Sequence, residues 1–470
     1  MMVDTRSFAV SNPASGMRIA EVPDCGPKEA LRAVDVAVNA FEQWRKETPF
    51  ARSRHLRNWH DAILRNEEEL ARTMTEEMGK PIVEARGEVR YAAAFVEWYA
   101  EEAKRLFGAV VPSQFTAKRL LTLNEPVGPV VAITPWNFPA AMVARKVAPA
   151  LAAGCSVIVK PAEQAPLTAL RMINLWREAG GAYDVIQVLT TSNPAPLVEA
   201  LLDDVRVRKL TFTGSTEIGS SLYARAARTV KRVSLELGGH APFLVFQDAD
   251  VDSAVREVIA SKFRNSGQTC VCANRIYVQE PLVASFVERL AAAVGTLRVG
   301  DPSSEETQVG PLVDEQGLRK VREHVNDAVG KGARIVVGGI DLGGLYYAPT
   351  VLVGVEAGMR ILEEETFGPV APVLTFKHEA EAVRLANTTP YGLAAYLWTR
   401  DLSRAFRVAE TLDYGIIGVN DGLPSTPQAP FGGRKASGIG REGGPWGIEE
   451  YLDVKFLSIA LDEAPRCAEA

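Results

Sequence analysis

Hydrophobic residues recur at helical spacing through the first hundred positions of the chain. Apolar residues stand at positions 31, 34, 38 and 41, directly after the helix-start signal Gly26-Pro27. A second apolar pattern covers about residues 50 to 78 and stops at Gly79-Lys80-Pro81, and a third covers about residues 82 to 107 and stops at Gly108. The sequence therefore predicts three helices before residue 110.

The pattern changes character at residue 119. Alternating, β-rich segments flank Glu125-Pro126 within residues 119–133 and predict a pair of strands joined by a turn. A helix is expected at 143–153, ending at Gly154. Short apolar runs then alternate with helical patterns, with strands expected at 130–134, 156–160, 184–189, 209–213 and 243–246. Short apolar strands separated by helices are typical of a parallel, doubly wound sheet.

A second strand–helix series follows residue 250. Its expected strands lie at 275–279, 334–337, 370–376, 394–398 and 415–419, so the chain is predicted to hold two α/β domains. The tail is strand-like again at 454–459. If it pairs with residues 113–129, the two segments form a small sheet projecting from the body. An exposed sheet edge of that kind invites pairing with another subunit.

Composition and charge narrow the class of protein. At roughly 150 residues per domain, 470 residues suggest about three domains. A net charge of −6 argues against nucleic acid or an anionic membrane as a partner, and no apolar run reaches the roughly 20 residues of a spanning helix. The first ten residues do not read as a signal peptide. Five scattered cysteines and five histidines indicate neither a disulfide framework nor a metal site, which predicts a cytoplasmic protein.

One polar, glycine-containing segment, FRNSGQTCVC at 263–272, reads as a loop after a helix. A cysteine in such a loop, near backbone donors, can be a nucleophile with a low pKa, although a lone cysteine is more often buried and inert. Further motifs stand on both sides of this loop: Pro135-Trp136-Asn137-Phe138-Pro139, Lys160-Pro161-Ala162-Glu163, FTGSTEIG at 212–219, LELGG at 235–239, Glu365-Thr366-Phe367-Gly368-Pro369 and Pro430-Phe431-Gly432-Gly433.

These motifs, in this order and spacing, resemble those of the aldehyde dehydrogenase superfamily from about residue 8 to 460. The resemblance implies an α/β fold of the aldehyde dehydrogenase type. A Rossmann-type NAD-binding domain would comprise residues 1–112 and 130–238, and an α/β catalytic domain residues 239–446. Residues 113–129 and 447–470 would form a small β extension for oligomerisation, as a homodimer or a homotetramer.

The resemblance also implies three catalytic roles. Cys270 would be the nucleophile, and the Asn137 amide with the Cys270 backbone N–H would form the oxyanion hole. Glu236 would activate the water that hydrolyses the thioester, and its apolar Leu-Glu-Leu-Gly-Gly context is expected to raise its pKa. This glutamate also disfavours acyl transfer to coenzyme A.

The cofactor motifs predict a nicotinamide dinucleotide. Residues 214–219 follow a strand and open a helix, which suits a phosphate, although Thr216 takes the second glycine position of G-x-G-x-x-G. A carboxylate at Glu163 accepts from ribose hydroxyls and repels a 2′-phosphate, so NAD is the expected cofactor, with NADP possible because Lys160 stands nearby. The residues that the resemblance assigns to the cofactor are Trp136, Lys160, Glu163, Gly214, Ser215, Glu365 and Phe367.

The segments SKFRNSGQTCVCANR and WNFPAAMVARKVAPAL are similar to the succinate-semialdehyde dehydrogenase branch of the superfamily. That similarity implies that Arg145, Arg264 and Ser425 hold the distal carboxylate of the substrate, a task to which the planar arginine fork is suited, although a single arginine more often forms a surface ion pair. The expected reaction is oxidation of succinate semialdehyde to succinate through a thiohemiacetal and a thioester on Cys270.

Three alternatives stay open at this point. Two prolines beside Ser425 leave the chain length of the acid undecided, so glutarate semialdehyde or another small anionic aldehyde competes. A non-enzymatic binding protein or a cofactor-free thiol hydrolase on the same scaffold is a further possibility. In this branch a Cys-x-Cys loop can also close as a redox-sensitive disulfide, which would give Cys272 a redox role; the alternative is a small packing residue.

Overall fold

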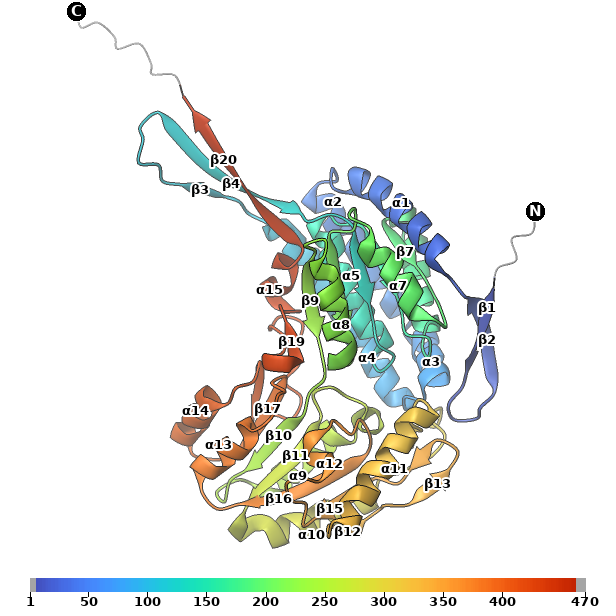
Figure 1. Cartoon of the computed structure of the whole chain (residues 1–470), viewed down its shortest axis with the longest axis vertical. Coiled ribbons are helices and arrows are strands. Elements are labelled where there is room, and N and C mark those ends of the chain that lie inside the picture. The colour runs from blue at the N-terminus through green and yellow to red at the C-terminus, as the bar shows by residue number, and fades with distance from the viewer. Residues whose placement is uncertain (1–5, 462–470) are drawn as a thin grey trace, which may run out of the picture.

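Two α/β units, each built round its own sheet, make up the body of the molecule, and a three-stranded sheet projects from the first unit (Figure 1). The structure is a computed structural model that describes residues 6–461. None of the helices described between these residues combines the length and hydrophobicity of a membrane-spanning segment. Residues 1–5 and 462–470, which belong to the first expected domain and the expected extension, lie outside the described residues.

The first sheet has the strand order β19-β9-β8-β5-β6-β7, and its neighbours are parallel except for β19 against β9. Its central strands consist of buried residues throughout, as expected for a sheet covered on both faces. The strands are β5 (Val130–Ile133), β6 (Val157–Lys160), β7 (Ile186–Val188), β8 (Lys209–Thr213), β9 (Arg232–Glu236) and β19 (Gly438–Ile439).

Helices cover both faces of this sheet. Apolar side chains of α2 to α6 pack on one face, and those of α1, α7 and α8 pack on the other. Gly154 ends α5 with a φ of 102°, a conformation that favours glycine. The helices are α1 (Pro27–Trp44), α2 (Pro49–Arg65), α3 (Glu67–Met78), α4 (Ile82–Glu102), α5 (Pro139–Ala153), α6 (Leu167–Glu178), α7 (Pro194–Asp203) and α8 (Thr216–Ala227).

Several expectations for this unit need correction. Leu31 is 45% exposed, and alanines at 30, 33 and 37 take its place on the buried face of α1. The pattern at 50–78 forms two helices that meet at Asn66, and α4 ends at Glu102 and not at residue 107. The strand β9 was not expected, although its sequence RVSLE alternates polar and apolar residues, a pattern that was a usable signal for a strand.

The second unit is a sheet of strand order β12-β15-β16-β11-β10-β17-β18, parallel except for β12 against β15. Its strands are β10 (Ala241–Val245), β11 (Ala273–Gln279), β12 (Arg334–Val337), β15 (Thr350–Val353), β16 (Val370–Phe376), β17 (Ala394–Trp398) and β18 (Ile416–Val419). The apolar run at 243–246, which its position before residue 250 groups with the first strand–helix series, lies in the second sheet, within the residues 239–446 that the resemblance assigns to the catalytic domain. Periodicity cannot tell which of two sheets a buried strand joins.

Helices flank the second sheet as well. They are α9 (Val251–Lys262), α10 (Val283–Gly295), α11 (Glu315–Gly330), α12 (Arg360–Glu363), α13 (Glu379–Asn387) and α14 (Leu402–Thr411). The short helix α15 (Gly444–Glu449) packs against α4 and α5 of the first unit. Two antiparallel hairpins lie outside the large sheets: β1 (Ser7–Ser11) with β2 (Arg18–Pro23), and β13 (Asp341–Gly343) with β14 (Tyr346–Tyr347).

The projecting sheet consists of β3 (Ala109–Val111), β4 (Lys118–Pro126) and β20 (Leu452–Ala460), in the order β20-β4-β3 (Figure 1). The expected pairing of the tail with residues 113–129 is confirmed by the antiparallel register from Leu452–Pro126 to Ala460–Lys118. The expected pairing on the two sides of Glu125-Pro126 is wrong, because β4 continues through Pro126 and β5 joins the first sheet. The division into domains at the stated residues stays a prediction.

Candidate active site

The parallel strands of the first sheet end at one edge, and the functional segments follow them. Residues 135–137 come after β5, Lys160 closes β6, residues 214–215 come after β8 and Glu236 closes β9. The loop with Cys270, between α9 and β11 of the second unit, faces this edge. Ligand sites of open α/β sheets lie at the carboxyl ends of strands, so the topology puts the candidate site between the two units.

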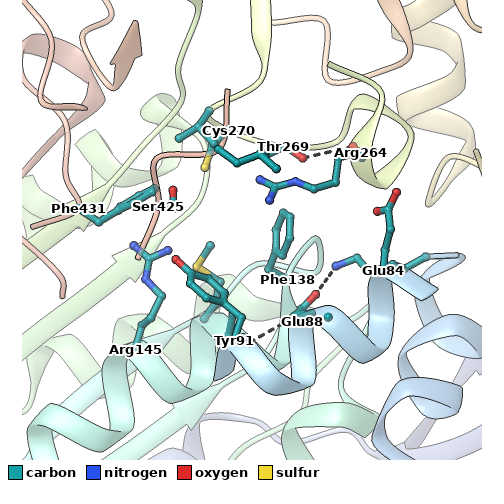
Figure 2. Close-up of a pocket in the computed structure, with 16 residues that line it drawn as sticks. Glu84, Glu88, Tyr91, Phe138, Arg145, Arg264, Thr269, Cys270, Ser425 and Phe431 are labelled. Carbon is teal, nitrogen blue, oxygen red and sulfur yellow. Dashed lines mark hydrogen bonds and ion pairs between the residues drawn. The ribbon is translucent and has the colours of Figure 1, made fainter. Parts of the chain in front are cut away.

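Two cavities of about 330 Å³ each meet at Cys270, which lines both. The first, which we call the substrate-side cavity, is shown in Figure 2, where Arg145, Arg264 and Ser425 surround the space in front of the Cys270 thiol. Tyr91 of α4 lines the same space. The structure thus brings all three expected carboxylate-binding residues into one cavity beside the expected nucleophile.

The two arginines differ in their surroundings. Arg145 is 2% exposed, and its Nη2 lies 2.8 Å from Oε2 of Glu442. Burial acts to lower the pKa of Arg145, but the charge of Glu442 together with Tyr91, Glu236 and Cys270 outweighs it, and the pKa is raised. The Arg264 guanidinium lies over the Phe138 ring at 5.3 Å, and unlike Arg145 it forms no ion pair with a carboxylate of residues 6–461. Arg264 is therefore the less neutralised of the two cations.

The Cys270 loop owes its shape to three consecutive left-handed residues. Asn265, Ser266 and Gly267 have φ of 50°, 57° and 77°, a region that side chains other than glycine rarely adopt. A Cβ on Gly267 would lie 2.2 Å from the Gly368 carbonyl oxygen, so only glycine fits there. The Asn265 N–H donates to Glu84 Oε2 at 2.7 Å, which ties the strained turn to α4.

The Cys270 thiol differs from the expected low-pKa nucleophile. Burial, followed by the charge of Glu365, raises its pKa to about 12, while Arg145 acts in the opposite direction. The expected low pKa was wrong, because the segments that bury the thiol and the carboxylate of Glu365 lie far from the loop in the sequence. The thiol is therefore protonated near neutral pH, and its attack on an aldehyde requires a proton acceptor.

Asn137 is 3% exposed, and hydrogen bonds fix both its main chain and its side chain. Its Nδ2 donates to the Gln268 carbonyl oxygen at 3.0 Å, in the Cys270 loop. Its own carbonyl oxygen accepts from Lys80 Nζ at 2.7 Å and from Asn265 Nδ2 at 3.0 Å. The amide therefore lies beside the nucleophile loop in a fixed orientation.

Glu236 is 3% exposed at the end of β9, and its Oε2 has no hydrogen-bond partner among the described residues. Burial and then the charge of Glu442 raise the pKa of Glu236 well above its ordinary value, and Arg145 and Lys146 act against them. The expected direction of the shift is confirmed. A carboxyl with a raised pKa is suited to accept a proton near neutral pH.

The second cavity, which we call the cofactor-side cavity, is lined by Trp136, Gly214, Ser215, Glu365 and Phe367 of the expected cofactor residues. The rings of Trp136 and Phe367 meet edge to face, with centroids 5.5 Å apart. Burial raises the pKa of Glu365 to about 7, and its Oε1 lies 3.5 Å from the Gly239 N–H.

The donors and acceptors at this cavity fit a dinucleotide. The Ser215 hydroxyl accepts from the Ile218 N–H as the N-cap of α8, so the helix begins at the cavity with its positive end. Thr213 Oγ1 in the lining is buried without a partner in the described part of the chain. At the end of β6, Lys160 Nζ and Glu163 Oε2 lie 3.2 Å apart, and neither belongs to the lining residues of the cavity.

Cys272 is fully buried behind the nucleophile loop. Its sulfur lies 3.3 Å from Asn274 Oδ1, 3.5 Å from the Gly267 carbonyl oxygen and 3.6 Å from Lys262 Nζ. Both Cys270 and Cys272 are free thiols. A bond between their sulfurs would require the buried contacts of Cys272 to break.

Two groups of residues at the site were not anticipated from the sequence. Lys80, just before α4, and Glu84 and Glu88 on α4 line one wall of the substrate-side cavity. Figure 2 labels the two glutamates. Glu442 lies between Arg145 and Lys146. The spacing of Glu84 and Glu88, four residues apart on one helix face, was a usable signal, whereas nothing local to Glu442 indicates its role. Among residues 6–461 no cluster of three metal-ligating side chains occurs.

Comparison with known proteins identifies the family of this chain. Residues 2–457 match the model of the aldehyde dehydrogenase family. The chain is 51% identical over 456 residues to a glutarate-semialdehyde dehydrogenase of Pseudomonas putida, covering 97% of this chain and 95% of that protein. It is 51% identical over 454 residues to the NADP⁺ succinate-semialdehyde dehydrogenase GabD of Escherichia coli, covering 96% and 94%.

A solved structure gives the same result for the fold. The succinate-semialdehyde dehydrogenase of Burkholderia pseudomallei superposes with a TM-score of 0.96 at 49% identity, covering 97% of this chain and 95% of that one. The family match spans nearly the whole chain, and the expected fold is confirmed. This chain therefore belongs to the aldehyde dehydrogenase family, whose members use NAD(P).

Proposed function

We propose that this enzyme oxidises a small aldehyde that carries a carboxylate, succinate semialdehyde in the first place, to the dicarboxylate. The observation that supports the proposal is the substrate-side cavity, in which Arg145, Arg264 and Ser425 surround the thiol of Cys270. Arginine binds a carboxylate through two parallel hydrogen bonds, which fixes the orientation of the substrate as well as its position. The distal acid group would then direct the aldehyde carbon toward Cys270.

In this proposal Cys270 attacks the aldehyde carbon, and Glu236 accepts the thiol proton. The raised pKa of the thiol makes a base necessary, and the raised pKa of Glu236 makes that carboxyl the suitable one. The new C–S bond leaves negative charge on the aldehyde oxygen, toward which the Asn137 amide and the Cys270 N–H would donate. Glu236 later removes a proton from the water that hydrolyses the thioester.

The cofactor would lie along the cofactor-side cavity and supply the acceptor for the hydride. We propose that the α8 N-terminus with Gly214 and Ser215 binds its pyrophosphate, and that Glu365 accepts from hydroxyls of its nicotinamide ribose. Trp136 and Phe367, in edge-to-face contact, would border its nicotinamide end.

NAD is the proposed preferred cofactor. A carboxylate at Glu163 accepts from both hydroxyls of the adenine ribose and repels a 2′-phosphate. Lys160 lies 3.2 Å from this carboxylate and partly offsets its charge, so NADP is retained as a second, weaker cofactor. The E. coli relative is named as an NADP⁺ enzyme, so the preference for NAD needs a direct comparison of the two cofactors.

Steady-state formation of NADH and NADPH tests the function. Succinate semialdehyde, glutarate semialdehyde and propanal are compared at equal concentrations, with Cys270→Ala as the control. We expect the highest kcat/KM for succinate semialdehyde with NAD⁺ and no turnover in the control. A higher kcat/KM for glutarate semialdehyde would favour the alternative substrate, which is the one named for the P. putida relative. Absence of turnover with any aldehyde would contradict an enzymatic role.

Assembly through the projecting sheet is also proposed. Val110, Val454 and Phe456 on β3 and β20 are exposed apolar side chains, and their strands lie at the two edges of that sheet. A second copy of the chain that covers them would give a homodimer or a homotetramer. Light scattering coupled to size exclusion distinguishes these from a monomer. The scattered free cysteines favour a reducing compartment, and we propose a cytoplasmic enzyme.

A further inference from the structure

Lys80 holds the main chain of Asn137 from a different part of the sequence. It stands between the end of α3 and the start of α4, and its side chain is 1% exposed. Its Nζ donates to the Asn137 carbonyl oxygen at 2.7 Å and forms an ion pair with Glu88 Oε2. The same ammonium lies 3.9 Å from the centre of the Phe138 ring, so it contacts two consecutive residues of the turn that follows β5.

Glu88 holds the helix that follows this turn. Its second oxygen, Oε1, accepts from the N–H groups of Ala140 and Ala141 at 2.9 and 3.1 Å. These belong to the first turn of α5, whose N-cap residue Phe138 provides no side-chain hydrogen bond. Glu88 therefore supplies the missing cap from α4. Its charge lies at the positive end of the α5 dipole.

The two residues form a single brace around residues 137–141. Figure 2 shows Glu88 and Phe138 below the Cys270 thiol. A buried ion pair usually contributes no more stability than apolar residues of the same volume. Stability alone therefore does not explain why this pair is fully buried, and its contacts suggest a different role. The pair contacts the carbonyl oxygen of Asn137 and the N–H groups of Ala140 and Ala141, so it holds the main chain from which the Asn137 amide projects.

We propose that Lys80 and Glu88 are positioning residues that fix the Asn137 amide in the direction needed to donate to the developing oxyanion. The proposal rests on the proposed function of Asn137. Electrostatic stabilisation of an oxyanion depends on donors that are already oriented, and a displacement of about 1 Å can lower a rate by about a hundredfold. Neither Lys80 nor Glu88 touches the reacting atoms, because both act through Asn137.

The chain offers a matched control for simple helix capping. Glu77 of α3 is also buried, and it accepts from the N–H groups of Leu167 and Thr168 at 2.6 and 3.0 Å, at the start of α6. Its hydrogen bonds go to α6 alone and none goes to Asn137. A variant at Glu77 thus perturbs a buried carboxylate cap without perturbing the amide.

The test variant is the double substitution Lys80→Met/Glu88→Gln. It leaves no unpaired buried charge, and the glutamine retains an oxygen for the α5 N–H groups. We expect kcat to fall by about 10- to 100-fold, because an oxyanion donor is displaced but not removed. KM for the aldehyde and for NAD⁺ should change by less than about threefold. The alkylation rate of Cys270 by iodoacetamide, which needs no oxyanion donor, should be unchanged, and Glu77→Gln should retain kcat.

The same double substitution in an Asn137→Ala background separates positioning from general damage. If Lys80 and Glu88 act through the amide, its removal makes them dispensable, and the further loss of kcat should be less than about threefold. An equal loss in both backgrounds, or an equal loss in Glu77→Gln, would overturn the proposal. Full activity of the double variant would overturn it as well.

These outcomes are distinct from failure of the proposed function. If Asn137→Ala alone retains kcat, the oxyanion role of Asn137 is wrong and the inference fails with it. If Asn137→Ala loses activity and the double variant does not, only the inference is wrong. Where circular dichroism finds the double variant unfolded, Lys80→Met alone serves, since it removes the contact with Asn137 and leaves Glu88, which protonation can neutralise, as the acceptor for α5. It is expected to lower kcat without a change in KM.

Discussion

Replacement of Arg264 by methionine should remove the preference for a carboxylated substrate. The variant Arg264→Met keeps an unbranched apolar stem and removes the guanidinium. Arg264 lines the cavity beside Cys270 and forms no ion pair with a carboxylate of residues 6–461. Its charge is therefore available to a ligand, whereas that of Arg145 is shared with Glu442.

The magnitude follows from this difference. A hydrogen bond to a charged group contributes about 1.5–3 kcal/mol, which corresponds to about 10- to 150-fold in kcat/KM. Arg264→Met should lower kcat/KM for succinate semialdehyde within that range, while kcat/KM for propanal, which has no carboxylate, should change by less than about threefold. The assay is steady-state NADH formation with both aldehydes at saturating NAD⁺.

Arg145→Met provides the contrast. Arg145 lowers the pKa of both Glu442 and Glu236, so its removal acts on the proposed base as well as on the substrate. This variant should slow the oxidation of both aldehydes. An equal loss for both aldehydes in Arg264→Met, or a loss confined to succinate semialdehyde in Arg145→Met, would refute the assignment of the two roles.

Three further predictions concern pH, cofactor and redox state. Glu442 raises the pKa of Glu236, so Glu442→Gln should move the rising limb of the pH–rate profile to lower pH; a shift to higher pH would contradict the coupling. Glu163→Ser should raise the ratio of kcat/KM for NADP⁺ over NAD⁺ by about tenfold, because a like charge near the 2′-phosphate is removed, as measured by initial rates with each cofactor. Peroxide should inactivate the wild type reversibly through a Cys270–Cys272 disulfide, and dithiol-recoverable loss in Cys272→Ala would exclude that bond.

The sequence by itself determined the class of fold and the order of the chemistry-bearing segments. Buried strands such as 130–133 and 157–160 are runs of four mostly apolar residues that helical patterns follow, and such local patterns depend only on neighbouring residues. The pairing of the tail with the projecting strand was also predictable, because both segments are strand-like and lie outside the two α/β series. The candidate residues around Cys270 were found through motifs that are contiguous in the chain.

Only the tertiary structure decided which groups those residues meet. The strand at 241–245 joins the second sheet and not the first, because a buried apolar strand fits either. The pKa of Cys270 is raised and not lowered, because burial and the charge of Glu365, from another segment, set it. Arg145 pairs with Glu442, and Lys80 with Asn137, through contacts between segments far apart in sequence. Electrostatic interactions depend on distance in space and on burial, and neither quantity is written in the local sequence.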